Sequence, residues 1–340
     1  METLTIITNR EKELADLYKR MDATRDRVYN TAYALTGVNK KALDNVISVT
    51  MPYGAIFANT IINDLMEAVK QTVIEGEVSE KQKHVIETFL DDNRAEANEQ
   101  LRRRGYPPLH AWWSNHVCIR SFIGVRWVSQ MVDGVFTIDC LPVDMRWTPF
   151  EYGNDGLNWV ASTTFRSKTS LEAGFPGESF SGTTDIEVRD YWDSEKNEVW
   201  INKKLVRSQK NPFGYPPFVI AAPATGFMLR DKGYIAHESE DLLFLIRELY
   251  DEINRSVSIE QTIGMETIQP RKQDIVEEMD SKPAAAPPKI GEAVKRKKGF
   301  EWQLMPVRDL NQAFFTGRDD LNRAIEMGGV NAIDLGNVSQ

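Results

Sequence analysis

The sequence is poor in cysteine and histidine, the residue types on which most disulfide frameworks and many metal centres depend. In 340 residues there are two cysteines, Cys118 and Cys140, and four histidines. Two cysteines are too few for a disulfide framework, and their scarcity suits a reducing compartment. The composition therefore does not support a small secreted scaffold stapled by disulfides.

Long apolar runs are also missing. No stretch of about 18 consecutive apolar residues occurs, which predicts that the chain has no transmembrane helix. The first ten residues contain Leu4, Ile6 and Ile7, but no basic segment precedes these residues and no small-residue cleavage site follows. We therefore expect neither a secretory signal nor a membrane partner.

The common catalytic and nucleotide-binding motifs are absent. The sequence has no P-loop, G-x-G-x-x-G, H-E-x-x-H, C-x-x-C or G-x-S-x-G. His110, His116 and Cys118 lie close in sequence, but their spacings match no zinc pattern and a fourth ligand is missing. Asp139 and Asp144 flank the end of a predicted strand, and no other residue supports a metal there. We therefore predict no metal, no cofactor and no enzymatic activity.

The charge balance limits how the protein can meet nucleic acid. Asp and Glu number 50 against 41 Lys and Arg, which gives a formal net charge of −9. A protein that grips duplex DNA through its phosphates is usually basic overall. Tight static binding is therefore disfavoured, although an acidic protein can still let DNA pass without holding it.

The most regular pattern lies in residues 241–261, which predict a long amphipathic helix. Its charged face carries Arg247, Glu248, Asp251, Glu252 and Arg255. One interpretation is a helix lying on a globular body. The other is a rod that packs beside copies of itself, with the apolar face at the subunit interface. That face has spacings of four, three, four and four, as in an α-helix, and consists of Leu242, Ile246, Leu249, Ile253 and Val257.

A compact interruption and a second helix follow. Residues 265–269 predict a short strand that ends at Pro270, and the Pro/Ala-rich residues 283–288 favour an extended conformation. Residues 300–307 predict a half-buried strand, and residues 309–327 a second helix. Between these elements lie an acidic arm and a basic arm. The acidic arm has Asp274, Glu277, Glu278 and Asp280, and the basic arm has Lys289, Lys295, Arg296, Lys297 and Lys298.

The N-terminal part predicts helices and the middle of the chain predicts strands. Residues 193–197, between two tryptophan-bearing strands, predict a hairpin loop. The predicted fold class is α+β, with an antiparallel β domain inserted between helical segments. Helical patterns cover 10–30, 56–69, 79–104 and 111–124. Strand patterns cover 125–130, 136–141, 146–147, 159–165, 186–192, 198–201 and 217–221.

The order of these segments resembles the portal, or head-to-tail connector, proteins of tailed double-stranded DNA bacteriophages. Residues 141–153, L-P-V-D-M-R-W-T-P-F-E-Y-G, are similar to the strand and turn that open the β part of the family's wing. Residues 211–219 match the link N-x-x-G-x-x-P-F-V that leads towards the stem. Residues 248–258 are similar to the first stem helix, and residues 48–65 to the extended piece and helix near the start of the wing. Each motif is weakly specific alone, and their joint order carries the resemblance.

The resemblance implies a portal-like division of the chain. A wing would comprise a helical part, 1–124, and an antiparallel β part, 125–236. Two long stem helices, 237–263 and 308–327, would carry a small α/β clip, 264–307, at their tip, and 328–340 would begin a tunnel loop. Family members continue with another helix and a crown domain, whereas this sequence ends at Gln340. The crown is therefore not carried over.

The resemblance also implies a function and partners. A homo-oligomeric ring, usually of twelve subunits, would occupy one capsid vertex of the virion after assembly in the host cytoplasm. Viral double-stranded DNA would pass through its channel during packaging and ejection, weakly and without sequence specificity. The terminase large subunit, head-completion or adaptor proteins and the major capsid protein would be its other partners.

Particular residues follow from the same resemblance. The terminase and the adaptor proteins would dock mainly through the clip, and the tunnel loop would project into the channel. The candidates for clip docking or clip interface are Asp274, Glu277, Glu278, Lys295, Arg296, Lys297, Lys298 and Trp302. The candidates for the DNA channel are Asn331, Asn337 and Gln340.

Two alternatives remain at the level of sequence. One is a different ring or adaptor protein of the virion, which would also be acidic and free of catalytic motifs. The other is an enzyme with an unfamiliar site in the β domain, such as a glycan-active site built on Trp147, Trp159, Trp192 and nearby carboxylates.

The basic arm has three interpretations: a solvated loop, a contact with passing DNA, or a contact with the acidic arm of a neighbouring chain. The third generates a prediction about assembly. If the acidic arm of one chain meets the basic arm of its neighbour, the contact sets the direction of ring closure. Replacing all four residues Lys295, Arg296, Lys297 and Lys298 by glutamate should then weaken assembly, as measured by sedimentation at low salt. Unchanged assembly of this variant would refute the contact.

Overall fold

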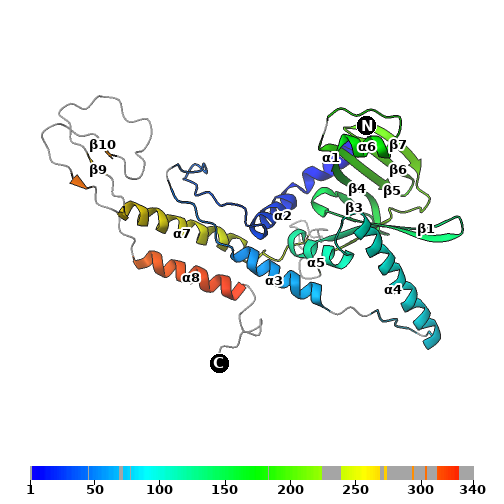
Figure 1. Ribbon diagram of the computed structural model, residues 1–340, viewed down its shortest axis with the longest axis horizontal. Coiled ribbons are helices and arrows are strands. Elements are labelled where there is room, and N and C mark those ends of the chain that lie inside the picture. The colour runs from blue at the N-terminus through cyan, green and yellow to red at the C-terminus, as the bar shows by residue number, and fades with distance from the viewer. Residues whose placement is uncertain are drawn as a thin grey trace. The chain divides into compact units, whose positions relative to one another are not determined.

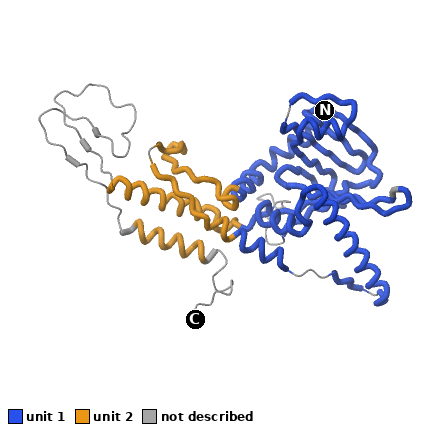
Figure 2. Tube along the Cα trace, in the orientation of Figure 1, with its two compact units in different colours: residues 1–25, 58–242 blue, residues 26–57, 243–340 orange. Residues whose placement is uncertain are grey.

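The computed structural model (Figure 1) describes residues 2–44, 46–68, 72–76, 78–182, 184–223, 239–268 and 312–328, with the pairs 272–273, 293–294 and 303–304. The chain divides into two compact units (Figure 2). The first unit comprises Met1–Arg25 and Ala58–Leu242, and the second comprises Asp26–Phe57 and Leu243–Gln340. Each unit is therefore assembled from two separate stretches of sequence.

Two antiparallel sheets form the body of the first unit. The larger sheet has the order β3-β4-β5-β6-β7, and the smaller has the order β2-β1-β8. Together with the helices, they confirm the predicted α+β class. The larger sheet consists of β3 (Phe150–Tyr152), β4 (Leu157–Arg166), β5 (Ile186–Asp193), β6 (Lys196–Ile201) and β7 (Lys204–Lys210). The smaller consists of β1 (Ile123–Val132), β2 (Val135–Val143) and β8 (Phe218–Ala221).

Turn chemistry explains the hairpins. The Asp193 carboxylate accepts hydrogen bonds from the backbone N–H groups of Glu195 at 2.8 Å and Lys196 at 2.7 Å, which closes the turn between β5 and β6. The hairpin predicted at residues 193–197 is therefore confirmed. Asp133 and Gly134 connect β1 to β2 with φ of 50° and 79°, the left-handed conformation of a two-residue hairpin turn.

Helices cover these sheets. Ile7 of α1 packs on Trp159 and Tyr191 of the larger sheet, and Leu17 and Met21 of α2 enter a core that includes residues of both sheets. A side-chain cap at Ser79 starts α4, which lies along β2. The helices are α1 (Glu2–Glu13), α2 (Ala15–Val28), α3 (Tyr53–Glu67), α4 (Glu80–Arg103), α5 (Leu109–Arg120) and α6 (Lys168–Gly174).

A buried cation ties α2 to the middle of the first unit. The Arg120 side chain is only 9% exposed and donates to the Met21 carbonyl at 3.2 Å and to the Asp144 carboxylate at 3.1 Å. Arg146 binds both carboxylate oxygens of Asp22, at 3.0 and 2.9 Å. Asp144 also accepts from the Arg146 N–H, which forms the cap of a 3-10 turn, η1 (Met145–Trp147). The strand predicted at residues 146–147 is therefore wrong.

The second unit contains the helices α7 (Arg247–Ile268) and α8 (Gln312–Gly328). They lie side by side and run in opposite directions (Figure 1). Three short strands form a separate sheet in the order β10-β9-β11, with β10 parallel and β11 antiparallel to β9. Their bounds are β9 (Lys272–Gln273), β10 (Ala293–Val294) and β11 (Gln303–Leu304).

The two cysteine thiols should be unreactive in the folded protein. Cys118 is 5% exposed and Cys140 is fully buried. Burial raises the pKa of each thiol to about 11, so that almost no thiolate exists at pH 8. An aromatic disulfide reagent should therefore label neither thiol quickly at pH 8, and both at once in denaturant. Rapid labelling of two thiols per native chain would contradict this burial.

Candidate functional site

The first predicted rod exists as α7, with shifted ends. Residues 242–246 form turns, and the helix proper begins at Arg247. It continues through Met265 to Ile268, so the strand predicted at residues 265–269 is wrong where the structure describes it. Gly264 inside the helix costs only about 1 kcal/mol relative to alanine, which packing can offset.

The two faces of α7 are distributed much as the periodicity predicts. Of the five residues predicted for the charged face, Glu248, Asp251, Glu252 and Arg255 are exposed, whereas Arg247 is half-buried. On the apolar face, Ile246 is 1% and Ile253 2% exposed within a single chain, whereas Leu242, Leu249 and Val257 are half-buried. A role for these five residues in a subunit interface stays a prediction. Ile246 and Ile253 are already covered within one chain. Of the other three residues, Leu249 and Val257 lie on α7 and still have exposed apolar surface.

Polar side chains in one row of α7 hold an extended segment of the chain, which we call the strap (residues 46–52). The backbone N–H of Met51 donates to the Asn254 side-chain carbonyl at 2.8 Å. The N–H of Val49 donates to the Ser258 hydroxyl at 2.8 Å, and that of Ile47 to the Thr262 hydroxyl at 3.0 Å. Every second residue of the strap therefore binds every fourth residue of the helix.

The two periods match in length. Four helical residues advance about 6 Å, and two extended residues about 6.6 Å. The hydroxyls are also satisfied as donors, because Ser258 donates to the Asn254 carbonyl at 2.6 Å and Thr262 to the Ser258 carbonyl at 2.8 Å. Each hydroxyl thus joins helix and strap with no lost hydrogen bond.

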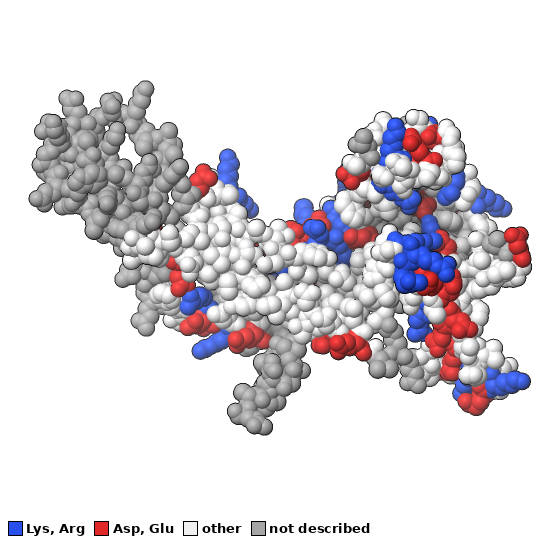
Figure 3. Space-filling view, viewed as in Figure 1, with Lys and Arg blue, Asp and Glu red and all other residues white. Residues whose placement is uncertain are grey.

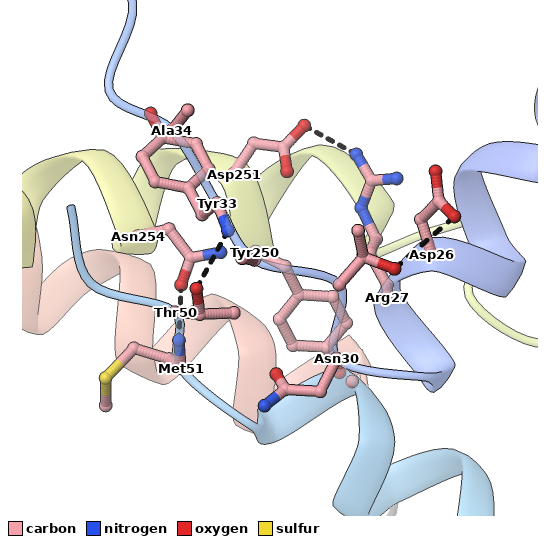
Figure 4. A pocket seen from close by; sticks show the side chains of 13 residues that line it. Asp26, Arg27, Asn30, Tyr33, Ala34, Thr50, Met51, Tyr250, Asp251 and Asn254 are labelled. Atoms are coloured by element: carbon pink, nitrogen blue, oxygen red, sulfur yellow. Dashed lines mark hydrogen bonds and ion pairs between the residues drawn. The ribbon is translucent and has the colours of Figure 1, made fainter.

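The alternate residues of the strap bind a second segment. The N–H of Tyr33 donates to the Thr50 hydroxyl at 2.8 Å, and the N–H of Leu35 donates to the Ser48 hydroxyl at 3.0 Å. Figure 4 shows two of these bonds together, Tyr33 to Thr50 and Met51 to Asn254. Residues 33–35, the strap and α7 therefore form three adjacent layers joined by side-chain-to-backbone hydrogen bonds.

An arginine closes one end of this arrangement. Arg27 donates from Nε to the Arg247 carbonyl at 3.0 Å and forms an ion pair with Asp251. Beside it lies a cavity of 220 Å3 between the segment after α2, the strap and α7 (Figure 4). Tyr250 forms part of its wall and is 4% exposed, and burial raises the pKa of its phenol to about 12.

The helix α8 is less covered than α7. None of its described side chains, residues 314–326, is fully buried. The apolar residues Phe314, Leu321 and Ile325 are half-buried, and Phe315 is 37% exposed. Arg318 forms an ion pair with Glu260 of α7. On the face drawn in Figure 3, charged side chains of this unit gather along α8, while the surface over α7 and the strap is largely uncharged.

The remaining predicted site residues lie outside the described part of the chain. These are the clip candidates Asp274, Glu277, Glu278, Lys295, Arg296, Lys297, Lys298 and Trp302, and the channel candidates Asn331, Asn337 and Gln340.

The residues considered for a metal have structural contacts instead. His110 Nε2 is 2.7 Å from the Leu65 carbonyl, and His116 stacks on Trp112 with its Nδ1 3.1 Å from that residue's carbonyl. Burial lowers the pKa of His116. Asp139 forms ion pairs with two arginines, and no group of three or more potential ligands is found among the described residues.

The tryptophans considered for glycan binding are not gathered on one surface. Trp159 and Trp192 are 6% and 7% exposed, and the Trp159 indole N–H donates to Glu151 at 2.7 Å. Only Trp147 is substantially exposed, at 41%, and its ring packs against Phe165. Two of the three rings therefore belong to the core and offer no face to a sugar.

Of the comparisons with known proteins, the one with solved structures found a match. No protein-family model and no curated protein matches this chain. Among solved structures, the chain is similar to a protein described as "Neck of native GTA particle computed with C12 symmetry", with 11% sequence identity and a TM-score of 0.39. The match covers 85% of this chain and 68% of the other. Within the described residues, no helix is both long enough and apolar enough to span a bilayer.

The hydrogen bonds of the strap generate a prediction about stability. Ser258→Ala removes the acceptor for the Val49 N–H at a fully buried position, which should lower the free energy of unfolding by about 1–3 kcal/mol. Ser256→Ala is the matched control, because this half-buried serine lies on the same helix and its side-chain hydroxyl makes no hydrogen bond among the described residues. It should change stability by less than about 0.5 kcal/mol.

Urea unfolding gives the free energy of unfolding of both variants. Hydrogen exchange of the Val49 N–H shows whether the loss arises at the strap. Equal losses in the two variants would argue that the strap bond contributes little.

Proposed function

We propose that this chain is a portal-type subunit, copies of which form a closed ring at a capsid vertex through which double-stranded DNA passes. The single observation that carries the proposal is the incomplete burial of α8. Most helical stability in proteins comes from packing of an apolar face. In one chain, α8 packs mainly on α7 and leaves Phe314, Phe315, Leu321 and Ile325 partly open.

A neighbouring copy would complete this packing. If the helix pairs stand side by side around an axis, the open face of α8 can meet Leu249 and Val257 of the next chain. Such a contact uses two different surfaces of the same subunit, and it generates a ring when the rotation between neighbours closes. The exposed charges at Glu248, Glu252 and Arg255 would then lie on the rim of the contact and set its direction.

The overall charge is compatible with a conduit. A formal charge of −9 opposes strong attraction to a polyanion, so that DNA can slide through a ring without being retained. In this proposal residues 328–340 approach the DNA through Asn331, Asn337 and Gln340. Residues 264–307 form the clip, which receives the terminase large subunit during packaging and head-completion or adaptor proteins afterwards, and the major capsid protein surrounds the ring.

Particle shape tests the proposal. Twelve chains of 38.8 kDa would sediment as one particle of roughly 470 kDa, and electron micrographs should show rings with an axial hole that admits duplex DNA. Rings with an axial hole too narrow for duplex DNA would instead support a different ring or adaptor protein of the virion. A stable monomer at high concentration would reject both ring proteins.

A single substitution tests the face of α8. Phe315 is 37% exposed in one chain, so that Phe315→Glu should leave the subunit folded but abolish ring formation, because the carboxylate would be buried against the neighbour. Gln261→Glu adds the same charge at an exposed position of α7 and should still form rings. Sedimentation velocity reports assembly and circular dichroism reports folding. Normal rings from the Phe315 variant would place the interface elsewhere.

A further inference from the structure

A cationic pocket lies in the first unit, apart from the helices invoked for assembly. It has a volume of 320 Å3 and lies between α1, β5 and the turn that joins β6 to β7. Its lining contains three cations and no carboxylate, which is unusual in a chain with nine more acids than bases. The lining residues are Leu4, Thr5, Thr8, Asn9, Lys12, Arg189 and Lys203.

The guanidinium of Arg189 forms the fixed part of the pocket. Its side chain is 13% exposed and is held by Glu187, which accepts from Nε at 2.9 Å, and by Glu11, which lies 3.4 Å from Nη2. These contacts occupy Nε and Nη2, and no contact to Nη1 is found among the described residues. The N–H groups of Nη1 therefore remain available for a ligand in a group whose orientation is already set.

The two lysines are the adjustable part. Lys12 and Lys203 are exposed, and neither forms an ion pair with any residue that the structure describes. Thr8 and Asn9 precede Lys12 by four and three residues, so all three lie on one face of α1. That face therefore offers a hydroxyl, an amide and an ammonium group to the same pocket.

The position of Lys203 is conformationally unusual. Asn202 and Lys203 connect β6 to β7 with φ of 46° and 66°, a two-residue turn in which the second position favours glycine. A lysine there accepts backbone strain that a glycine would avoid. Its side chain lines the pocket, which is a reason for lysine at this position.

We propose that this pocket binds a phosphate dianion, either inorganic phosphate or the terminal phosphate of a small phosphorylated molecule. Lys12 and Lys203 neutralise its charge, and Nη1 of Arg189, Thr8 and Asn9 donate hydrogen bonds to its oxygens, since Glu11 and Glu187 already balance the charge of Arg189. Three cations at one point suit a compact dianion. Duplex DNA instead needs contacts spread along its backbone, whereas the groups of this pocket converge on one point.

Titration of the full-length protein with inorganic phosphate, followed by calorimetry at low salt, tests the site. The double variant Lys12→Gln/Lys203→Gln should bind at least about tenfold more weakly than the natural chain, because two charge-assisted contacts are lost. The control Lys19→Gln/Lys204→Gln removes the same charge from lysines paired with Asp16 and Glu178, outside the pocket. It should bind phosphate within about twofold of the natural chain.

A second variant separates the site from the fold. Lys203→Gly relieves the left-handed turn, so it should raise the urea midpoint while weakening phosphate binding. A nucleoside monophosphate and a short DNA duplex serve as competitors, and the monophosphate should displace inorganic phosphate at the lower concentration. No binding by the natural chain, equal weakening in the control, or stronger displacement by the duplex would overturn the proposal. None of these outcomes depends on ring formation.

Discussion

The second unit depends on a match between two backbone periods. Alternate N–H groups of the strap meet every fourth side chain of α7, because four helical residues and two extended residues cover nearly the same distance. A strand in a sheet would find its acceptors on another backbone, whereas here a helix supplies them from Asn254, Ser258 and Thr262. Since successive members of an i, i+4 row drift about 40° around the helix, the strap follows a gently coiled path. Residues far apart in the sequence are thereby fixed to one helix.

The sequence predicted those parts of the structure whose cause is local. The spacing of apolar residues identified α7, and runs of β character between turn signals identified β4, β5 and β6, the last of which is buried at nearly every position. It failed for β7, where Lys204, Arg207 and Lys210 belong to an exposed edge strand that buries little. It also failed at Arg146, where the preceding Asp144 caps a 3-10 turn. In both cases hydrogen bonds decide the conformation: β7 pairs with β6, and the Arg146 N–H donates to the Asp144 side chain. The pattern of residue types does not reveal such bonds.

The extended piece that contains the strap was expected, but its pairing with α7 was missed for a related reason. Ser258 and Thr262 are ordinary polar residues within an amphipathic helix, and hydroxyls there usually satisfy themselves on the preceding turn. These two do so as well, and they accept a bond from the strap in addition. Only the coincidence of a polar i, i+4, i+8 row with an extended segment elsewhere could have signalled the pairing. The clip and channel candidates stay predictions from the resemblance, because the structure does not describe them.

The burial pattern divides α7 between two tasks. Ile246 and Ile253 are covered within the chain, and the side chains of Asn254, Ser258 and Thr262 bind the strap, so these five side chains are engaged within one chain. The positions with remaining apolar surface are Leu249 and Val257 on α7, together with one side of α8. The strap holds α7 by hydrogen bonds, and α8 packs against α7, so the pair presents its open side in a defined direction. In the proposed ring, a surface with a defined direction would let identical chains repeat one contact until the ring closes, which a loosely held helix could not do.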